Sequence, residues 1–163
     1  MTTDVIEHAV AGALAEDVGS GDVTTEATVP ADAVGTAEIL VKEPGVVCGL
    51  AVAEATFRAL DDEIRFDALV EDGTVVSEVP AAVATVTGAE RTILTGERVA
   101  LNFLGRLSGI ATLTRRYADA VEGTGAAVLD TRKTTPGLRA SRSTRSRAEA
   151  ARTTASASTT PCS

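Results

Sequence analysis

The sequence predicts an α/β protein, in which an α+β sandwich domain is followed by the beginning of a truncated α/β barrel. Two observations carry this prediction. Residues 4–89 alternate helical spacing with short strand-like apolar stretches, which favours a mixed sheet covered by helices. From Glu90 a long helical pattern leads to a short apolar stretch that ends in polar residues, as in barrels that deliver side chains to a site.

Helical spacing and turn residues place the elements of the first half. Residues 4–18 carry apolar side chains at helical spacing, and Gly19 and Gly21 end that helix. Asp22 begins a short turn with the chemistry of a helix cap. The same analysis predicts, in order, a strand over 34–41, a buried strand over 45–49, a helix over 50–60, and strands over 64–68, 75–79 and 82–87.

A third helix dominates the region after Glu90, because eight apolar side chains from Ile93 to Ile110 fall on one face. Ser108 and Gly109 are predicted to break it, and helical spacing resumes over 111–121. A strand over 126–129 is expected next. These elements divide the chain into a sandwich domain at 1–106, the start of a barrel at 107–140 and a final segment at 141–163.

Composition excludes several classes of protein. The net charge of −8 argues against a general nucleic-acid binder, and no apolar run is long enough to cross a bilayer. The N-terminus has no signal-like segment, so a cytoplasmic protein is expected. Cys48 and Cys162 lie far apart, which favours neither a disulfide framework nor a zinc site. His8, the only histidine, is expected on an exposed helix face.

A basic cluster stands out in this acidic chain, in the loop expected after the strand over 126–129. Arg132, Lys133 and Arg139 share that loop with threonine, proline and glycine. Arginine offers a planar fork to carboxylate or phosphate, lysine offers a point charge, and loop amides and hydroxyls add neutral donors. The loop is suited to an anionic ligand with several charges, although a solvated basic loop would have the same composition.

Other polar residues have two interpretations each. Arg98 lies at the polar edge of the long helix, where a surface arginine pairing with Glu97 or Glu90 is the ordinary expectation. Glu16, Asp17 and Asp22 could serve as paired carboxylates for acid–base chemistry, but capping and turn roles around the two glycines are favoured.

Four motifs resemble, in order and spacing, the quinolinate phosphoribosyltransferase family. They are EDVGSGDVTT at 16–25, VKEPGVVCGL at 41–50, GERVALNFLGRLSGIATLT at 96–114 and LDTRKTTPGLRA at 129–140. The resemblance covers residues 4–140. It implies an N-terminal α/β sandwich followed by an α/β barrel. It also implies an enzyme that joins quinolinate to phosphoribosyl pyrophosphate, releasing pyrophosphate and CO₂ and forming nicotinate mononucleotide for NAD synthesis.

The resemblance also implies roles for four residues. Arg132 resembles the arginine that grips a quinolinate carboxylate. Lys133, taken as the catalytic residue, resembles a lysine lining the same site, with Thr131 beside it. Arg98 resembles an arginine that reaches the active site of the neighbouring subunit, which replaces the surface interpretation and implies a homodimer or larger homo-oligomer. Mg²⁺ is the implied cofactor, with ligands outside this chain. Neither nucleic acid nor membrane is an expected partner.

The chain departs from the family after Ala140. Ser141–Ser163 holds four arginines, one glutamate and none of the large apolar residue types, so it is expected to be disordered. Back-translated and read in a shifted frame, this segment yields a continuation like that of the family, so a frameshift is predicted. The chain would then be truncated and inactive. Alternatives are a molybdenum-associated paralogue, a biotinyl- or lipoyl-carrier-like module modified at Lys42, and a non-catalytic dimerisation fragment.

Overall fold

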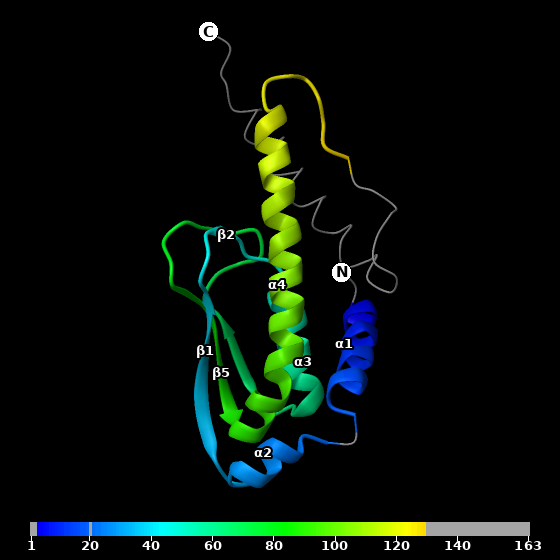
Figure 1. Ribbon diagram of the computed structural model, residues 1–163, viewed down its shortest axis with the longest axis vertical. Coiled ribbons are helices and arrows are strands. Elements are labelled where there is room, and N and C mark those ends of the chain that lie inside the picture. The colour runs from blue at the N-terminus through cyan, green and yellow to red at the C-terminus, as the bar shows by residue number, and fades with distance from the viewer. Residues whose placement is uncertain (1–2, 20, 130–163) are drawn as a thin grey trace.

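A computed structural model describes residues 3–19 and 21–129 (Figure 1). Four helices and five strands follow one another along the described residues. They are α1 (Thr3–Asp17), α2 (Val23–Thr28), β1 (Val34–Val41), β2 (Gly45–Val46), α3 (Leu50–Leu60), β3 (Arg65–Ala68), β4 (Val75–Val76), β5 (Ala81–Ala89) and α4 (Glu90–Val121). The mixed helix and strand content confirms the predicted α/β class.

The main sheet is antiparallel and three-stranded, in the order β1-β5-β3. Val34 pairs with Ala89 at one end and Val41 with Ala81 at the other, with a bulge between Ile39 and Leu40. Side chains alternate between the two faces of β1, so that one face is exposed and the other carries Ile39 into the core. The exposed face is polar where Thr36 and Thr87 share a hydrogen bond of 2.9 Å between their hydroxyl oxygens.

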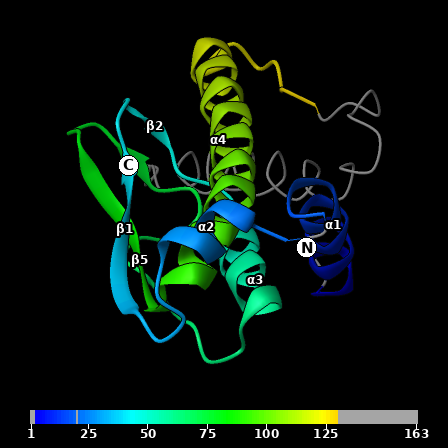
Figure 2. The same ribbon diagram turned by 60° about the horizontal axis from the view of Figure 1, so that its bottom comes forward.

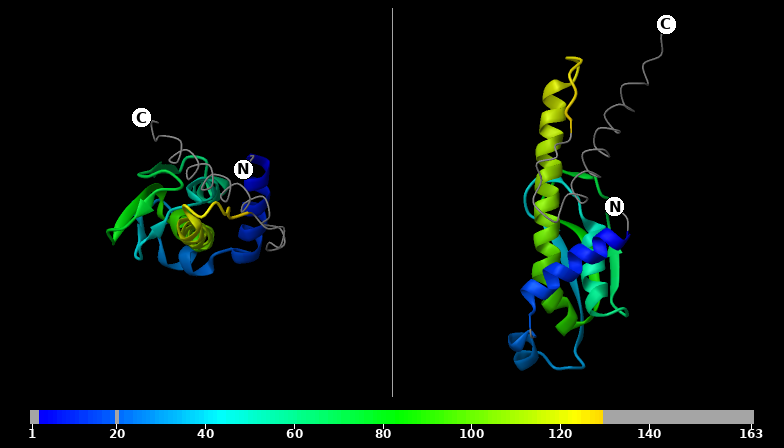
Figure 3. Two further views of the ribbon diagram at one scale, coloured as in Figure 1. Left: turned by 90° about the horizontal axis from the view of Figure 1, so that it is seen from above. Right: turned by 90° about the vertical axis from the view of Figure 1, so that its right-hand side faces the viewer.

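Helices α3 and α4 cover the inner face of the sheet, and α1 packs on the far side of these two helices (Figures 1 and 2). Seen from above, α4 stands between the sheet and α1 (Figure 3). Two clusters of buried residues result. The larger joins the sheet to α3 and α4 around Phe57, and the smaller joins α1 to α3 and α4 around Val10 and Leu107. With few aromatics available, aliphatic side chains supply most of both cores.

Helix α4 is continuous for 32 residues, so the predicted break at Ser108 and Gly109 is wrong. The buried side chains of Leu107 and Ala111 hold this part of the helix against the rest of the domain. That packing offsets the cost of about 1 kcal/mol that a glycine adds to a helix interior. The C-terminal half of α4 extends beyond the sheet (Figure 1).

Three predicted strands differ from the structure. The strands expected over 45–49 and 75–79 shorten to β2 and β4, which pair only with each other. The strand expected over 126–129 is absent, and Leu129 is 84% exposed. A strand needs a neighbour to satisfy its backbone groups, and no described residue pairs with this stretch. The predicted boundaries at 106 and 140 remain predictions, and residues 130–163 lie outside the described part.

The turn between β2 and α3 is held by a side chain that the sequence does not identify. Asp72 Oδ1 accepts hydrogen bonds from the backbone N–H groups of Gly49 and Leu50, at 2.8 and 3.0 Å. Gly49 has a φ of +110°, and a Cβ there would lie 2.8 Å from Leu107 Cδ1. Asp72 therefore supplies the N-terminal cap of α3 that Gly49, which has no side chain, cannot provide.

The described helices do not meet the requirements for spanning a membrane. None of them combines the necessary length with the necessary hydrophobicity.

Candidate anion-binding region around Arg98

Arg98 lies on α4 beside the C-terminal end of α1. Its Nε donates to both carboxylate oxygens of Asp17, at 3.2 and 3.1 Å. The Arg98 side chain is 59% exposed and that of Asp17 is 26% exposed. Arg98 is therefore paired as the surface interpretation expected, but with a residue 81 positions away rather than with Glu97 or Glu90.

Asp22 is a second carboxylate near Arg98, and it caps α2. Its Oδ1 accepts from the backbone N–H of Thr25 at 3.1 Å, and its Oδ2 accepts from the Thr25 hydroxyl at 2.7 Å. The Thr95 hydroxyl of α4 lies 3.5 Å from Oδ2. The bonds from Thr25, together with the charge of Arg98 and the Thr95 hydroxyl, hold the pKa of Asp22 below its ordinary value. The capping role predicted for Asp22 is confirmed.

Asp22→Asn is expected to remove the pH-dependent contribution that the Asp22 carboxylate makes to the stability of the fold. A lowered folded-state pKa stabilises the fold above the unfolded-state value, and this contribution disappears as the pH falls through the folded-state pKa. Asp22→Asn keeps the capping oxygen but not the charge. The melting temperature of the variant should therefore fall below that of the parent at pH 7, with the gap closing below the ordinary pKa of 3.8. Thermal melts followed by circular dichroism measure it, and a gap that widens in acid would contradict the assignment.

Arg91 fixes α2 against the start of α4. Its Nε and Nη2 donate to the carbonyl of Val29 at 2.9 and 2.7 Å, and Nη2 also donates to the carbonyl of Glu26 at 3.1 Å. These carbonyls lie at the C-terminal end of α2, where helices leave acceptors unsatisfied. Arg91 thereby holds in place the segment that carries Asp22 toward Arg98.

Removal of this clamp is expected to destabilise the fold. Arg91→Ala deletes three charge-assisted hydrogen bonds and should lower the free energy of unfolding by about 2 kcal/mol. Arg91→Lys, which cannot bond two carbonyls with one planar fork, should recover only part of the loss. Urea denaturation measures both variants, and an unchanged midpoint in Arg91→Ala would refute this role.

A shallow hollow of about 350 Å³ lies next to the Arg98–Asp17 pair. Its lining combines an apolar floor with charged and amide groups, from Ala13, Glu16, Asp17, Val99, Asn102, Phe103 and Arg106. Asn102 and Arg106 follow Arg98 at intervals of four, so the three side chains share one stripe of α4. This stripe presents donors beside Arg98 on an exposed helix face.

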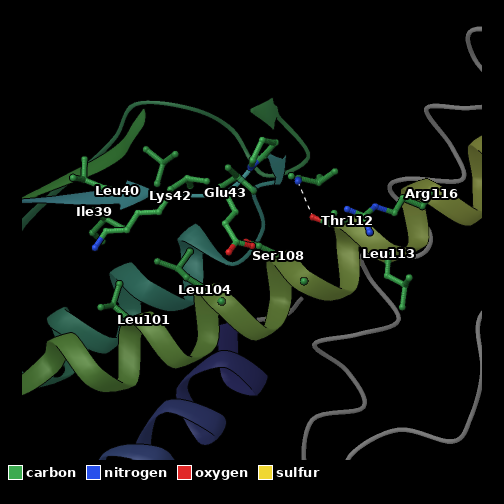
Figure 4. Close-up of a pocket in the computed structure, with 18 residues that line it drawn as sticks. Ile39, Leu40, Lys42, Glu43, Leu101, Leu104, Ser108, Thr112, Leu113 and Arg116 are labelled. Carbon is green, nitrogen blue, oxygen red and sulfur yellow. Dashed lines mark hydrogen bonds between the residues drawn. The ribbon is translucent and has the colours of Figure 1, made fainter. Parts of the chain in front are cut away.

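A larger groove of about 520 Å³ lies between the middle of α4 and the end of β1 with the loop that follows it, and does not include Arg98. Its walls are apolar, and Figure 4 shows Lys42, Glu43 and Arg116 around it. Two hydroxyls of α4 bond the backbone beside it: Thr112 accepts from Val46 N–H at 2.9 Å and Ser108 accepts from Cys48 N–H at 2.9 Å. These bonds attach β2 and the residues that follow it to α4, so the Thr112 and Ser108 hydroxyls serve the fold.

The remaining predicted site residues cannot be placed together. Thr131, Lys133 and Arg139 lie outside the described residues, as does Arg132. Within the described part, no group of three or more His, Cys, Asp or Glu side chains is arranged to hold a metal ion. Of the predicted site residues, only Arg98 has a described geometry.

Two other sequence interpretations can be judged. Lys42 does not lie at a hairpin tip, because β1 pairs with β5 and β2 pairs with β4. The carrier-like alternative required such a tip, so the fold contradicts it. His8 is exposed on α1, as expected. Asp17 was assigned a capping or turn role, but it forms an ion pair with Arg98 instead.

Two family models match the chain in sequence order. The quinolinate phosphoribosyl transferase N-terminal domain matches residues 22–108, and the C-terminal domain of the same family matches residues 110–152. The second match runs past Ala140, so it includes part of the segment for which a shifted frame is predicted. The predicted frameshift is tested by sequencing the gene around the codon for Ala140. An intact, error-free reading frame there would exclude a frameshift.

Curated proteins and solved structures are also similar to this chain. A quinolinate phosphoribosyltransferase from Nicotiana tabacum is 45% identical over 128 residues, covering 78% of this chain and 36% of that protein. A probable nicotinate-nucleotide pyrophosphorylase from Synechocystis is 45% identical over 126 residues, covering 77% and 42%. The crystal structure of NadC from Streptococcus pyogenes has a TM-score of 0.87 at 37% identity and covers 92% of this chain and 53% of that one. The chain thus spans less than half the length of these two curated relatives.

Proposed function

The chain belongs to the quinolinate phosphoribosyl transferase family, and on that premise we propose that the protein transfers phosphoribose to quinolinate in NAD biosynthesis. The overall reaction would consume phosphoribosyl pyrophosphate and yield nicotinate mononucleotide, pyrophosphate and CO₂. The observation that supports this proposal is the ordered match of both family domains across residues 22–152. We further propose that the enzyme works in the cytoplasm as a homodimer or larger homo-oligomer.

The proposed chemistry has two steps. The quinolinate nitrogen forms a bond to C1 of the ribose while the C1–oxygen bond to pyrophosphate breaks. The bond between the ring and the adjacent carboxylate then breaks, its electron pair returns to the ring carbon under the pull of the pyridinium nitrogen, and that carbon takes a proton. Both substrates are anions, so preorganised cations would offset their repulsion and hold them in reacting geometry.

Four residues are proposed for this site. Arg132 would hold a quinolinate carboxylate, with Thr131 beside it. Lys133 would line the same site as the catalytic residue. Arg98 would enter the site of a neighbouring subunit, which its exposed position on α4 allows. Mg²⁺ would accompany the pyrophosphate group, and the described residues provide no cluster of His, Cys, Asp or Glu side chains to hold it.

The proposal is tested on the whole gene product, expressed in the reading frame that continues the family match. Pyrophosphate release is measured with phosphoribosyl pyrophosphate and Mg²⁺, using quinolinate, nicotinate and other pyridine carboxylates in turn. Release that depends on quinolinate is expected. Release with another acid but not with quinolinate would contradict the proposal and favour the paralogue of different substrate.

The 163-residue chain provides the matched comparison. Its relatives carry more than half of their length outside the matched region, so this chain by itself is expected to release no pyrophosphate from the two substrates. Quinolinate-dependent turnover by the purified chain would show that residues 1–163 are sufficient.

A further inference from the structure

We infer that Asp17 is a positioning residue, which holds the Arg98 guanidinium by Nε so that its two Nη nitrogens face an anionic substrate. This inference rests on the proposed function, since it concerns how Arg98 would be presented to the site of a neighbouring subunit. Asp17 was expected only to have a capping or turn role at the end of the helix over 4–18. It gives the end of α1 a role in substrate binding.

The geometry of the pair is specific to one edge of the guanidinium. Nε donates to Asp17 Oδ1 at 3.2 Å and to Oδ2 at 3.1 Å, so both oxygens share a single N–H. Among the described residues, no hydrogen bond runs from either Nη of Arg98. The two Nη nitrogens form the part of the fork that recognises a carboxylate or phosphate through parallel bonds. Asp17 therefore occupies one edge of the guanidinium and leaves the other for a ligand.

The surroundings make Asp17 a defined point of attachment. It is the last residue of α1, and α1 is packed on α3 and α4 through the cluster around Val10 and Leu107. A return turn follows, in which Gly21 N–H donates to the Val18 carbonyl at 3.0 Å. Asp17 thus bonds Arg98 from the end of a helix that is packed against the core, and not from a neighbouring position on the surface of α4.

A second carboxylate, that of Asp22 at the start of α2, acts on the same guanidinium. Asp22 interacts with Arg98 through charge, while its oxygens are engaged by Thr25 and Thr95. Because these hydroxyls and the Thr25 amide occupy Asp22, it attracts Arg98 without bonding it directly. Asp17 forms direct hydrogen bonds with Arg98, whereas Asp22 acts on Arg98 only through its electrostatic field. The positioning role therefore belongs to Asp17.

Preorganisation explains why such a contact would matter for binding. A free arginine side chain on a helix surface samples many rotamers, and a ligand that immobilises it loses affinity through that entropy. An arginine already fixed by Nε presents its Nη groups at little further cost. The Arg98–Asp17 contact would favour binding of the substrate and of the transition state alike. Loss of this contact should therefore raise KM and leave kcat nearly unchanged.

The first test uses the 163-residue chain labelled with ¹⁵N. The Arg98 Nε–H signal should be resolved and should exchange slowly with water. Asp17→Asn should accelerate this exchange, and Asp17→Glu should restore slow exchange by returning a carboxylate. Glu54→Gln is the matched control, because Glu54 accepts from Arg58 Nε at 3.0 Å in an exposed pair on α3. Glu54→Gln should leave the exchange rate of the Arg98 Nε–H with water unchanged.

The second test measures kinetics in the whole gene product. Asp17→Asn should raise KM about fivefold for whichever of the two anionic substrates Arg98 contacts, with kcat and the other KM within about twofold. Asp17→Glu should recover most of the affinity, and Glu54→Gln should behave as the parent. An unchanged melting temperature in Asp17→Asn would separate positioning from folding.

The outcomes separate this inference from the proposed function. Rapid exchange of the parent Nε–H, or equal losses in kcat and in both substrate affinities, overturns the positioning role of Asp17. The positioning role is also overturned if Asp17→Asn accelerates the exchange of the Arg98 Nε–H but leaves KM and kcat unchanged. The pair would then have only a structural role. A gene product that turns over a different anionic substrate, with its KM still raised by Asp17→Asn, refutes the quinolinate assignment and supports the positioning role.

Discussion

Replacing Arg98 by alanine in the whole gene product is expected to lower kcat/KM for quinolinate about 100-fold or more, because a preorganised cation at an anionic site is lost. Arg98→Lys should recover part of the activity, since lysine keeps the charge but not the planar fork. Stability should change little, because the exposed Arg98–Asp17 pair contributes at most about 1 kcal/mol. Steady-state kinetics and a thermal melt on the same preparations measure both quantities.

Arg58→Ala is the matched control for this prediction. Arg58 is also an exposed arginine whose Nε bonds a carboxylate, at 3.0 Å from Glu54, but it lies on α3 and outside the motif of Arg98. Its kcat/KM should remain within about twofold of the parent, as is usual for surface substitutions. Equal activity of Arg98→Ala and Arg58→Ala would return Arg98 to the role of an ordinary surface arginine.

Truncation of Phe57 is expected to have the largest effect on the fold. Its ring is 2% exposed at the centre of the larger core and stacks on Phe66 with centroids 6.2 Å apart. Gly96 of α4 lies directly against it, since a Cβ at that glycine would be 2.8 Å from Phe57 Cδ1. Phe57→Ala leaves a cavity between the sheet, α3 and α4, and should lower the free energy of unfolding by about 4 kcal/mol.

Two comparisons sharpen the stability test. Phe57→Leu, which fills more of the space, should lose less than half as much as alanine. Leu94→Ala, at a side chain that is 42% exposed on α4, should change the free energy of unfolding by less than about 1 kcal/mol. Urea denaturation of the 163-residue chain measures all three. A Phe57→Ala loss no larger than that of Leu94→Ala would mean that this core does not hold the domain together.

Local patterns predicted the main elements well where packing agrees with them. The helix over 50–60 matches α3, and the strand over 34–41 matches β1, because each shows its period over its whole length. The pattern failed at Gly109, whose local cost is outweighed by buried neighbours in α4. It also failed over 126–129, where an apolar stretch alone could not form a strand without a partner.

The site could be predicted only in part, for a physical reason. Arg98 was predicted as a site residue from the motif around it, and this role stays a prediction. Its partner Asp17 lies 81 residues away, and charge pairing at that sequence separation is set by tertiary packing. Asp72 at the start of α3 was hidden in the same way, because it caps a helix that begins 22 residues earlier in the chain. Capping by Asp22 was predictable because Asp22 accepts from the backbone N–H of Thr25, which is only three residues further along the chain.

The proposal that this chain is part of an enzyme that ribosylates and decarboxylates quinolinate can be tested by following a labelled carboxylate. The whole gene product is supplied with phosphoribosyl pyrophosphate, Mg²⁺ and quinolinate that carries ¹³C in the carboxylate next to the nitrogen. Equal amounts of ¹³CO₂, pyrophosphate and unlabelled nicotinate mononucleotide are expected. Pyrophosphate release with the label retained in the nucleotide, or no quinolinate-dependent release at all, would contradict the proposal.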